Sequence, residues 1–182
     1  YKIKKKLLGV DLNKFLINKA KRYSKKYNNL NFETGNILKL KKKYKNQYDG
    51  LISLQTLSWL KDYEKAVIEM KKLNPKFICV SSLFWEDLID FNIRLNKLKD
   101  NNYKRKIKSF EYYNIYSLKN YINFLKKNGY KKNIALKFIL PKLINKKKSS
   151  KMGTYTVKDG KKFIQLSGPL KMNWYFVLSR KN

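Results

Sequence analysis

The chain has 182 residues, of which 43% are hydrophobic and 15% aromatic, so it is long enough for one domain with a sizeable core and too apolar to be wholly disordered. Its 44 basic and 12 acidic residues give a net charge of +32, which taken alone suggests nucleic acid or an anionic surface as a partner. Only four basic residues are arginine, the side chain on which nucleic-acid readers mostly depend, and lysines are spread along the whole chain. A solvated lysine surface is therefore the favoured interpretation, with a selected anion-binding face as the alternative.

Two absences restrict the chemistry. The chain has no histidine, which removes the usual general base at neutral pH and the commonest zinc ligand. Its single cysteine, Cys79, lies in an apolar run and is expected to be buried and unreactive, so neither a disulfide within the chain nor a metal site is expected. No apolar run reaches the roughly 18 residues that span a bilayer, and the basic start is not a signal peptide. We therefore expect a cytoplasmic protein without a membrane partner.

The first hundred residues alternate between apolar strands and amphipathic helices. Short apolar runs predict strands at residues 7–10, 31–34, 49–54 and 76–82. Apolar residues at helical spacing predict helices at 13–27, 62–73 and 86–98, with Asp11 or Asn13 as a cap of the first and residues 15, 16, 20, 23 and 27 on its apolar face. Apolar strands separated by helices indicate a parallel sheet covered on both faces.

The second half of the chain reads as antiparallel. A polar loop is predicted at 100–108, a helix at 117–128 that stops at Gly129, a strand at 131–140 that ends before Pro141, and a basic loop at 142–151. Predicted strands at 154–157 and 162–166 flank Asp159-Gly160, a strong hairpin signal, and a last strand is predicted at 174–179. The expected fold is α/β, with a mostly parallel sheet, helices on both faces and an antiparallel C-terminal hairpin, in a single domain of residues 1–182.

Polar residues stand at the carboxyl ends of three predicted strands, where open parallel sheets bind their ligands. Asp11 ends the first strand, where a carboxylate can accept both hydroxyls of a ribose, although a helix cap is the alternative. Asn36 follows the second strand, where its amide can meet an adenine edge, although a turn residue is the alternative. Ser53-Leu54-Gln55 ends the third strand and would face the reactive end of a ligand.

Over residues 7–82 the chain resembles the class I S-adenosylmethionine (SAM)-dependent methyltransferases. The matching segments are Leu8-Gly9-Val10-Asp11 with Ala20, Asn31-Phe32-Glu33-Thr34-Gly35-Asn36, Tyr48-Asp49-Gly50-Leu51-Ile52-Ser53 with Leu57, Leu60 and Asp62, and Leu73-Asn74-Pro75-Lys76-Phe77. The resemblance implies a Rossmann-like fold with SAM as cofactor, a cofactor-binding core at 1–99 and an acceptor side at 100–182. It implies that Asp11, with Leu12 beside it, holds the ribose, that Asn36 and Ile37 contact the adenine, and that Ser53, Leu54 and Gln55 lie beside the methionine part.

The chain departs from the family pattern in two respects. Asn36 stands where the family usually has Asp, but its amide oxygen can still accept a hydrogen bond from the adenine amino group. The family's first strand and Gly-rich loop should precede Leu7 and are missing, which would leave the strands at Leu8 and Leu51 on either side of a gap. We therefore expect an N-terminally truncated domain that by itself binds SAM poorly. The alternative is a degenerate fold that has lost the cofactor site.

The tail resembles a bacterial methyltransferase subgroup in three segments: Tyr112-Tyr113-Asn114-Ile115-Tyr116-Ser117, Met152-Gly153-Thr154-Tyr155-Thr156, and Ser167-Gly168-Pro169-Leu170 with Trp174-Tyr175-Phe176. Tyr112, Tyr113 and Tyr116 precede a predicted helix and, with Trp59, are predicted to line the acceptor pocket. Ordinary core and loop packing is the alternative for these tyrosines.

Methyl transfer from a sulfonium is an in-line displacement that needs alignment and a dry site, so the lack of histidine is no obstacle. Asp62, Glu86 and Asp87 follow predicted strand ends, but none is convincing as a base and no catalytic residue is assigned. Ser53-Leu54-Gln55-Thr56 lacks the acidic or Asn residue with Pro-Pro and an aromatic that nucleic-acid amino-methyltransferases carry, and Cys79 is mid-strand, unlike a cytosine-C5 nucleophile. The favoured acceptor is a small molecule or glycan precursor, O- or N-directed, and an anionic one such as a nucleotide-linked sugar would suit this surface. An RNA methyltransferase that uses the basic surface and a non-catalytic basic binding module are the alternatives.

Overall fold

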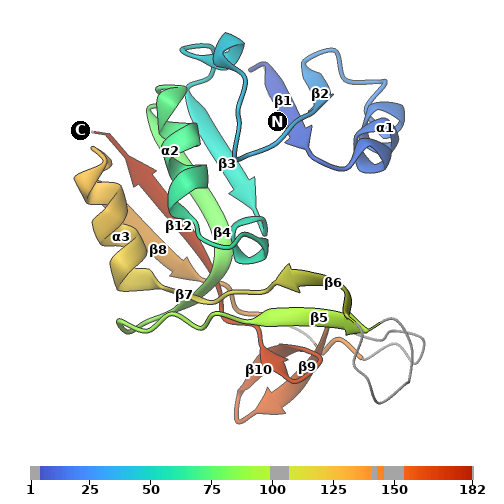
Figure 1. Ribbon diagram of the computed structural model, residues 1–182, viewed down its shortest axis with the longest axis vertical. Helices are drawn as coiled ribbons and strands as arrows, with labels where there is room; N and C mark the ends of the chain where they lie inside the picture. The colour runs from blue at the N-terminus through green and yellow to red at the C-terminus, as the bar shows by residue number, and fades with distance from the viewer. Residues whose placement is uncertain (1–4, 99–106, 141–142, 146–153, 182) are drawn as a thin grey trace. The chain divides into compact units, whose positions relative to one another are not determined.

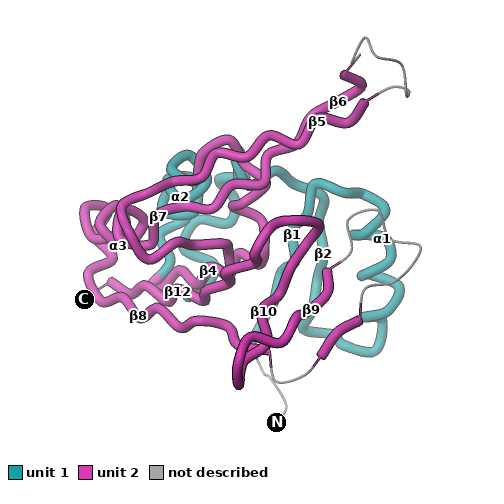
Figure 2. Tube along the Cα trace, turned by 90° about the horizontal axis from the view of Figure 1, so that it is seen from below, with its two compact units in different colours: residues 1–49, 64–75 teal, residues 50–63, 76–182 magenta. Residues whose placement is uncertain are grey.

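The computed structural model describes residues 5–98, 107–140, 143–145 and 154–181, which belong to two compact units (Figure 2). The first unit comprises residues 1–49 and 64–75, and the second comprises residues 50–63 and 76–182. In the described part of the chain, no helix is long and apolar enough to cross a membrane.

The first unit begins with a parallel strand–helix–strand crossover (Figure 1). Strand β1 (Leu7–Asp11) pairs in parallel with β2 (Leu30–Thr34), and helix α1 (Lys14–Tyr23) connects them. The Asn13 side chain accepts hydrogen bonds from the backbone N–H groups of Phe15 (3.0 Å) and Leu16 (3.3 Å), so the predicted cap is confirmed at Asn13.

The predicted apolar face of α1 was wrong. Ile17 is the buried residue of this helix, with 3% of its surface exposed, whereas Phe15 and Tyr23 are each 69% exposed. The helix also ends four residues early. The backbone turns after Ser24, whose C=O accepts from Tyr27 N at 2.8 Å, so Tyr27 falls outside the helix.

The rest of the first unit is a short 3₁₀ helix, η1 (Lys42–Tyr44), and helix α2 (Glu64–Lys72), whose Ala66, Val67 and Met70 are buried. Leu40 N donates to the Glu69 carboxylate at 3.2 Å. Asn46 N donates to Leu73 O at 3.0 Å. These bonds hold the lysine-rich segment of residues 40–46 to α2 and to the residue that follows it.

The second unit contains a five-stranded sheet. Its main path runs β3 (Gly50–Leu54), β4 (Phe77–Trp85), β12 (Trp174–Arg180) and β8 (Lys132–Lys137), and β7 (Tyr116–Ser117) pairs with the end of β4. Strand β3 is parallel to β4, whereas β12 is antiparallel to both β4 and β8. Strands β3, β4 and β8 therefore run in one direction, and their carboxyl ends at Leu54, Trp85 and Lys137 form one edge, which we call the carboxyl edge (Figure 1).

Helix α3 (Leu118–Lys127) packs on this sheet through aromatic side chains. Its buried Tyr121 contacts Phe84 of β4 with a ring separation of 4.9 Å, and Tyr63 at 5.1 Å. Ser117 caps the helix by accepting from Asn120 N at 3.2 Å, and Gly129 follows its end at φ +94°. The predicted helix and its glycine stop are confirmed.

The helix predicted at 86–98 was wrong. The residues after β4 lead without a helix into β5 (Arg94–Leu98), which pairs antiparallel with β6 (Ile107–Tyr112), so residues 107 and 108 are strand and not loop. Phe91 and Ile115 exchange two backbone hydrogen bonds, of 2.8 and 3.0 Å, and Ile93 N donates to the Asn114 side chain at 2.9 Å. The segment thus satisfies its backbone groups with a distant segment instead of with its own preceding turn.

The predicted C-terminal hairpin is confirmed. Strands β9 (Thr154–Asp159) and β10 (Lys162–Ser167) pair antiparallel around Gly160, which has φ +57°, and β10 also pairs with β11 (Leu170–Lys171). Pro141 and most of the predicted basic loop at 142–151 lie outside the described residues. The fold is mixed α/β, but its sheets are small and mixed rather than mostly parallel, because β12 and the C-terminal strands all pair antiparallel.

Candidate functional site

In the first unit, Asp11 is the exposed last residue of β1. Its Oδ1 accepts a hydrogen bond from Asn13 N at 2.7 Å, so Asp11 shapes the turn into α1, although it is not the helix cap. Gly35 N donates to Asp11 O at 2.9 Å and joins the ends of β1 and β2. Within the residues that the structure describes, the second carboxylate oxygen accepts no hydrogen bond, so one acceptor faces solvent. The adjoining Leu12 is 71% exposed.

Asn36 follows β2 in the same unit and lies close to the end of β1. Its Oδ1 accepts from Leu38 N at 2.8 Å, which is the turn role weighed for it from the sequence. An amide oxygen has two lone pairs, so this oxygen retains the capacity for a second donor. Ile37 is half-buried beside it. The adenine role of both residues stays a prediction.

A carboxylate that sequence reasoning missed fixes the loop beyond β2. Glu33 accepts hydrogen bonds from Lys41 (2.8 Å), Tyr44 (2.6 Å) and Lys43 (2.9 Å). The hydrogen bond from Lys41, followed by those from Tyr44 and Lys43, holds the pKa of Glu33 at about 2. The lysines of the segment 40–46 are plain in the sequence, but nothing in it indicates this carboxylate as their partner.

In the second unit, Ser53 and Gln55 form the end of β3. Ser53 is 5% exposed, and its hydroxyl has no hydrogen-bond partner in the part of the chain that is described. Gln55 has φ +53°, in the left-handed region, and its N–H donates to Ser81 O at 2.8 Å. Leu54 between them is 62% exposed. A buried unpaired hydroxyl beside a strained backbone is typical of a ligand site.

The predicted acceptor-side aromatics are partly brought together. Trp59, at the end of the 3₁₀ helix η2 (Leu57–Trp59), is 45% exposed and packs on Tyr113 with a ring separation of 4.7 Å. Tyr113 donates to the Met172 sulfur at 3.1 Å, and Tyr116 donates to Leu60 O at 2.8 Å. Both tyrosines are buried with engaged hydroxyls, as the packing alternative expects.

Tyr112, the last residue of β6, is half-buried and packs edge-on against Phe110 at 5.6 Å. Whether any of the three tyrosines touches an acceptor stays a prediction.

Asn114 organises this region and was missed by sequence reasoning. It is fully buried, and its Nδ2 donates to Leu60 O and Lys61 O at 3.0 Å each. Its Oδ1 accepts from Ile93 N, and its backbone N–H donates to Ser58 O at 2.8 Å. The Asn114 side chain thereby joins residues 60 and 61, which follow η2, to Ile93, and so helps to fix the position of Trp59. An asparagine between tyrosines carries no sequence signal for such a role.

A family model described as a methyltransferase domain matches residues 2–151, which is most of the chain. The chain belongs to the methyltransferase domain family. It is a SAM-dependent methyltransferase. No curated protein sequence matches the chain.

Solved structures share the fold of this methyltransferase domain at low sequence identity. The N-terminal domain of EvdMO1, crystallised with S-adenosylhomocysteine (SAH) and D-fucose, has a TM-score of 0.61 and 8% identity over 100% of this chain and 68% of its own. A putative methyltransferase from Bacillus halodurans has a TM-score of 0.54 and 10% identity over 97% and 83%. The Burkholderia thailandensis 1,6-didemethyltoxoflavin-N1-methyltransferase, with 1,6-didemethyltoxoflavin and SAH bound, has a TM-score of 0.51 and 11% identity over 96% of this chain and 60% of its own.

The carboxylates near the carboxyl edge of the methyltransferase domain are engaged in ion pairs. Glu86, directly after β4, accepts from the Tyr175 hydroxyl and from Lys137 Nζ at 2.9 Å. Burial alone would raise its pKa, but the hydrogen bonds from Tyr175 and Lys137 outweigh it and lower the pKa to about 2. Asp87 pairs with Lys119 at 2.9 Å. A carboxylate with a pKa of about 2 is a weak proton acceptor, so Glu86 is not assigned as a general base.

Proposed function

We propose that this methyltransferase transfers the methyl group of SAM to a small molecule or glycan precursor by in-line displacement. The observation that supports methyl transfer is the match of the methyltransferase domain family to residues 2–151. The small-molecule acceptor is supported by structures of similar fold, among them one crystallised in the presence of D-fucose and one with bound 1,6-didemethyltoxoflavin. It is also supported by Ser53-Leu54-Gln55-Thr56, which lacks the motif of nucleic-acid amino-methyltransferases.

The first unit is proposed to bind the nucleoside of SAM. The free oxygen of Asp11 accepts the ribose hydroxyls, and Leu12 lies beside the sugar. The Asn36 oxygen accepts from the adenine amino group, and Ile37 contacts the ring. In support of these roles, Gly35 N bonds Asp11 O, which keeps the two polar side chains on adjoining strand ends.

The second unit is proposed to bind the methionine part and the acceptor. Ser53, Leu54 and Gln55 serve the methionine part, and the unpaired Ser53 hydroxyl is the group that a ligand would satisfy. Trp59 and Tyr112 offer aromatic surface to the acceptor. Tyr113 and Tyr116 hold Trp59 and η2 in place through the ring contact of Tyr113 and the hydrogen bond of Tyr116 to Leu60 O.

A further strand and a Gly-rich loop are proposed to complete the cofactor site. Strand β3 pairs only with β4 among the described residues, which leaves its other edge without strand partners. Ile52 and Leu54 on this edge strand are 65% and 62% exposed. An uncovered edge with exposed apolar side chains is where an additional strand pairs in natural sheets.

Titration of the full-length gene product with SAH tests the assignment. Asp11→Ala should weaken SAH binding at least about tenfold, because it removes the charged acceptor of the ribose hydroxyls. Asp49→Ala is the matched control, since Asp49 is an exposed carboxylate of the same unit that pairs with Lys5 at 3.2 Å. Equal SAH affinity in both variants would show that the ribose is not held at this strand end.

A further inference from the structure

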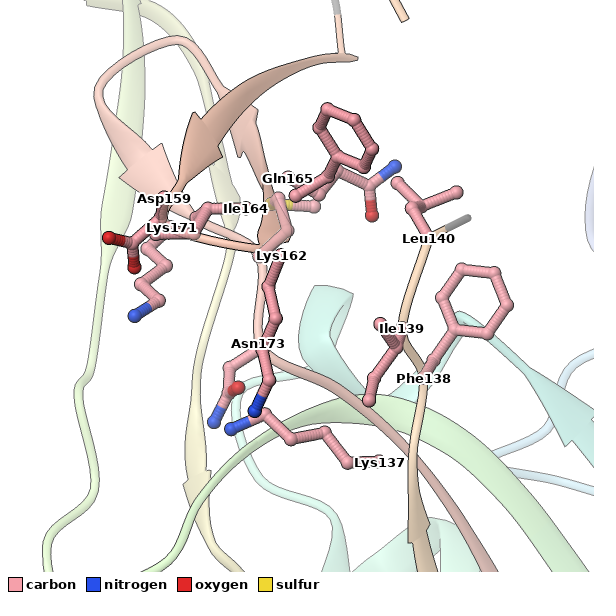
Figure 3. Close-up of a pocket in the computed structure, with 12 residues that line it drawn as sticks. Lys137, Phe138, Ile139, Leu140, Asp159, Lys162, Ile164, Gln165, Lys171 and Asn173 are labelled. Carbon is pink, nitrogen blue, oxygen red and sulfur yellow. The ribbon is translucent and has the colours of Figure 1, made fainter. Parts of the chain in front are cut away.

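A pocket of about 170 Å³ lies within the second unit at the carboxyl edge (Figure 3). We call it the hairpin pocket, and it is lined by residues 137–140 at the end of β8, by 159 and 162–165 of the hairpin, and by 171–173 before β12. Its volume is below the roughly 300 Å³ at which typical ligand pockets begin, so it suits a small molecule or one end of a larger one.

Positive charge dominates the polar lining of the hairpin pocket. Lys137, Lys162 and Lys171 contribute three ammonium groups against the single carboxylate of Asp159. Lys137 is already paired with Glu86, but neither Lys162 nor Lys171 has an ion-pair partner in the described part of the chain. The side chain of Lys162 extends toward Lys137 and the Asn173 amide (Figure 3). The lysines outnumber Asp159 and Glu86 together, so a bound anion would balance the remaining charge.

The other wall of the pocket is apolar and contains an unsatisfied acceptor. Phe138 and Ile139 are 45% and 56% exposed, and they share the lining with Phe163 and Ile164 of β10. Gln165 lines the pocket, and its Oε1 atom is buried and accepts no hydrogen bond from any described residue. Buried amide oxygens are nearly always paired, and a ligand hydroxyl or N–H is one donor that would satisfy this oxygen.

We infer that the hairpin pocket binds an organic oxyanion, a phosphate or carboxylate with an apolar body. Lys162 and Lys171 hold the oxyanion, the apolar body lies against Phe138 and Ile164, and a hydroxyl or N–H of the ligand donates to Gln165. The pocket adjoins the end of β8 beyond the carboxyl edge, where open α/β sheets bind their ligands. If the bound molecule is the methyl acceptor, the acceptor carries a phosphate or carboxylate group; this step rests on the proposed function.

Calorimetric titration of the purified protein with phenyl phosphate and with benzoate tests the inference at about 0.15 M salt, where distant surface charges are screened. The double variant Lys162→Gln/Lys171→Gln should bind the tighter probe about tenfold more weakly, because it loses two charge-assisted contacts. Lys158→Gln/Lys161→Gln removes the same charge from hairpin residues outside the pocket, and it should bind the probe as the unmodified protein does. Benzyl alcohol, which has no charge, should bind more weakly than either probe.

The two probes distinguish the head groups, since tighter binding of phenyl phosphate indicates a phosphate and tighter binding of benzoate a carboxylate. Equal weakening in both double variants, or no binding of either probe to the unmodified protein, overturns the inference. A parallel titration of the full-length gene product with SAH and with the probes separates the two proposals. Retained SAH binding without probe binding rejects the hairpin pocket alone, and probe binding without SAH binding rejects the proposed function alone.

Discussion

Glu86, which follows β4, and Lys137, the last residue of β8, form an ion pair of 2.9 Å although β12 lies between these two strands. Tyr175 of β12 donates its hydroxyl to the same carboxylate, so three neighbouring strands meet at one acidic group. The carboxyl edge of the five-stranded sheet is thereby fixed at the point where it adjoins the hairpin pocket.

This ion pair predicts an acid-dependent contribution to stability. The pKa of Glu86 is about 2 in the folded protein against an ordinary 4.5. Because the folded pKa is the lower, the stabilisation is present above about pH 4.5 and is lost as the pH falls toward 2. The Glu86 side chain is 46% exposed, so screening limits the effect to about 1 kcal/mol.

Urea unfolding across this pH range measures the effect. Glu86→Gln should be less stable than the unmodified protein near pH 7, and the difference should vanish toward pH 2. Asp87→Asn, which removes the neighbouring carboxylate that pairs with Lys119, is the matched control for loss of an exposed ion pair. An identical pH dependence in Glu86→Gln and the unmodified protein would contradict the role of Glu86.

Asn114 should be among the most sensitive polar positions of the second unit. Asn114→Ala removes the side-chain partner of Ile93 N and Lys61 O and leaves Leu60 O with the Tyr116 hydroxyl as its donor, at a cost of about 3 kcal/mol in the free energy of unfolding. Asn120→Ala on the exposed face of α3 is the matched control and should cost much less. Comparable losses in urea unfolding of the two variants would show that the Asn114 network contributes little.

Local signals predicted most of the elements correctly. The apolar runs at 7–10, 49–54 and 76–82 became β1, β3 and β4, because a short apolar run between turn residues is enough to define a strand. The cap at Asn13 and the turn at Gly160 were likewise set by neighbouring residues. Residues 86–98 were mispredicted because their backbone partners, which lie among residues 107–115, belong to a later segment of the chain.

The candidate site was predictable to the same extent. Asp11, Asn36 and Ser53 stand at strand ends as expected, since a strand end is a local feature. The contacts of Glu86 with Lys137 and Tyr175 join residues 51 and 89 positions apart, which no local pattern contains. The roles of the site residues toward SAM, and the missing first strand, stay predictions because they come from the family resemblance.

Ser53→Ala separates stability from ligand binding. Its buried hydroxyl has no partner among the described residues, so its removal should leave the free energy of unfolding unchanged or raise it by up to about 1 kcal/mol. SAH affinity should fall, because the hydroxyl is proposed to serve the methionine part.

The matched control is Ser82→Ala, which breaks the buried hydrogen bond of 2.8 Å between Ser82 and Ser58. It should lower the free energy of unfolding by about 1 kcal/mol. Ser53→Ala that destabilises the protein as much as Ser82→Ala does, with unchanged SAH affinity, would make Ser53 a structural residue only.

Gln55 allows its side chain and its backbone to be tested apart. With φ +53° it occupies the left-handed region, which costs a side-chain-bearing residue about 1 kcal/mol and costs glycine little. Gln55→Gly and Gln55→Ala both remove the side chain, so both should weaken SAH binding by the same factor. Only Gln55→Gly relieves the backbone. The freedom of glycine in the unfolded chain partly offsets this gain. The free energy of unfolding of Gln55→Gly, measured in urea, should therefore be higher than that of Gln55→Ala by at most about 1 kcal/mol. Equal unfolding free energies would show that relief of the backbone at Gln55 does not exceed the entropy cost of glycine, whereas unequal SAH affinities would show that backbone conformation, and not the side chain, governs binding at this strand end.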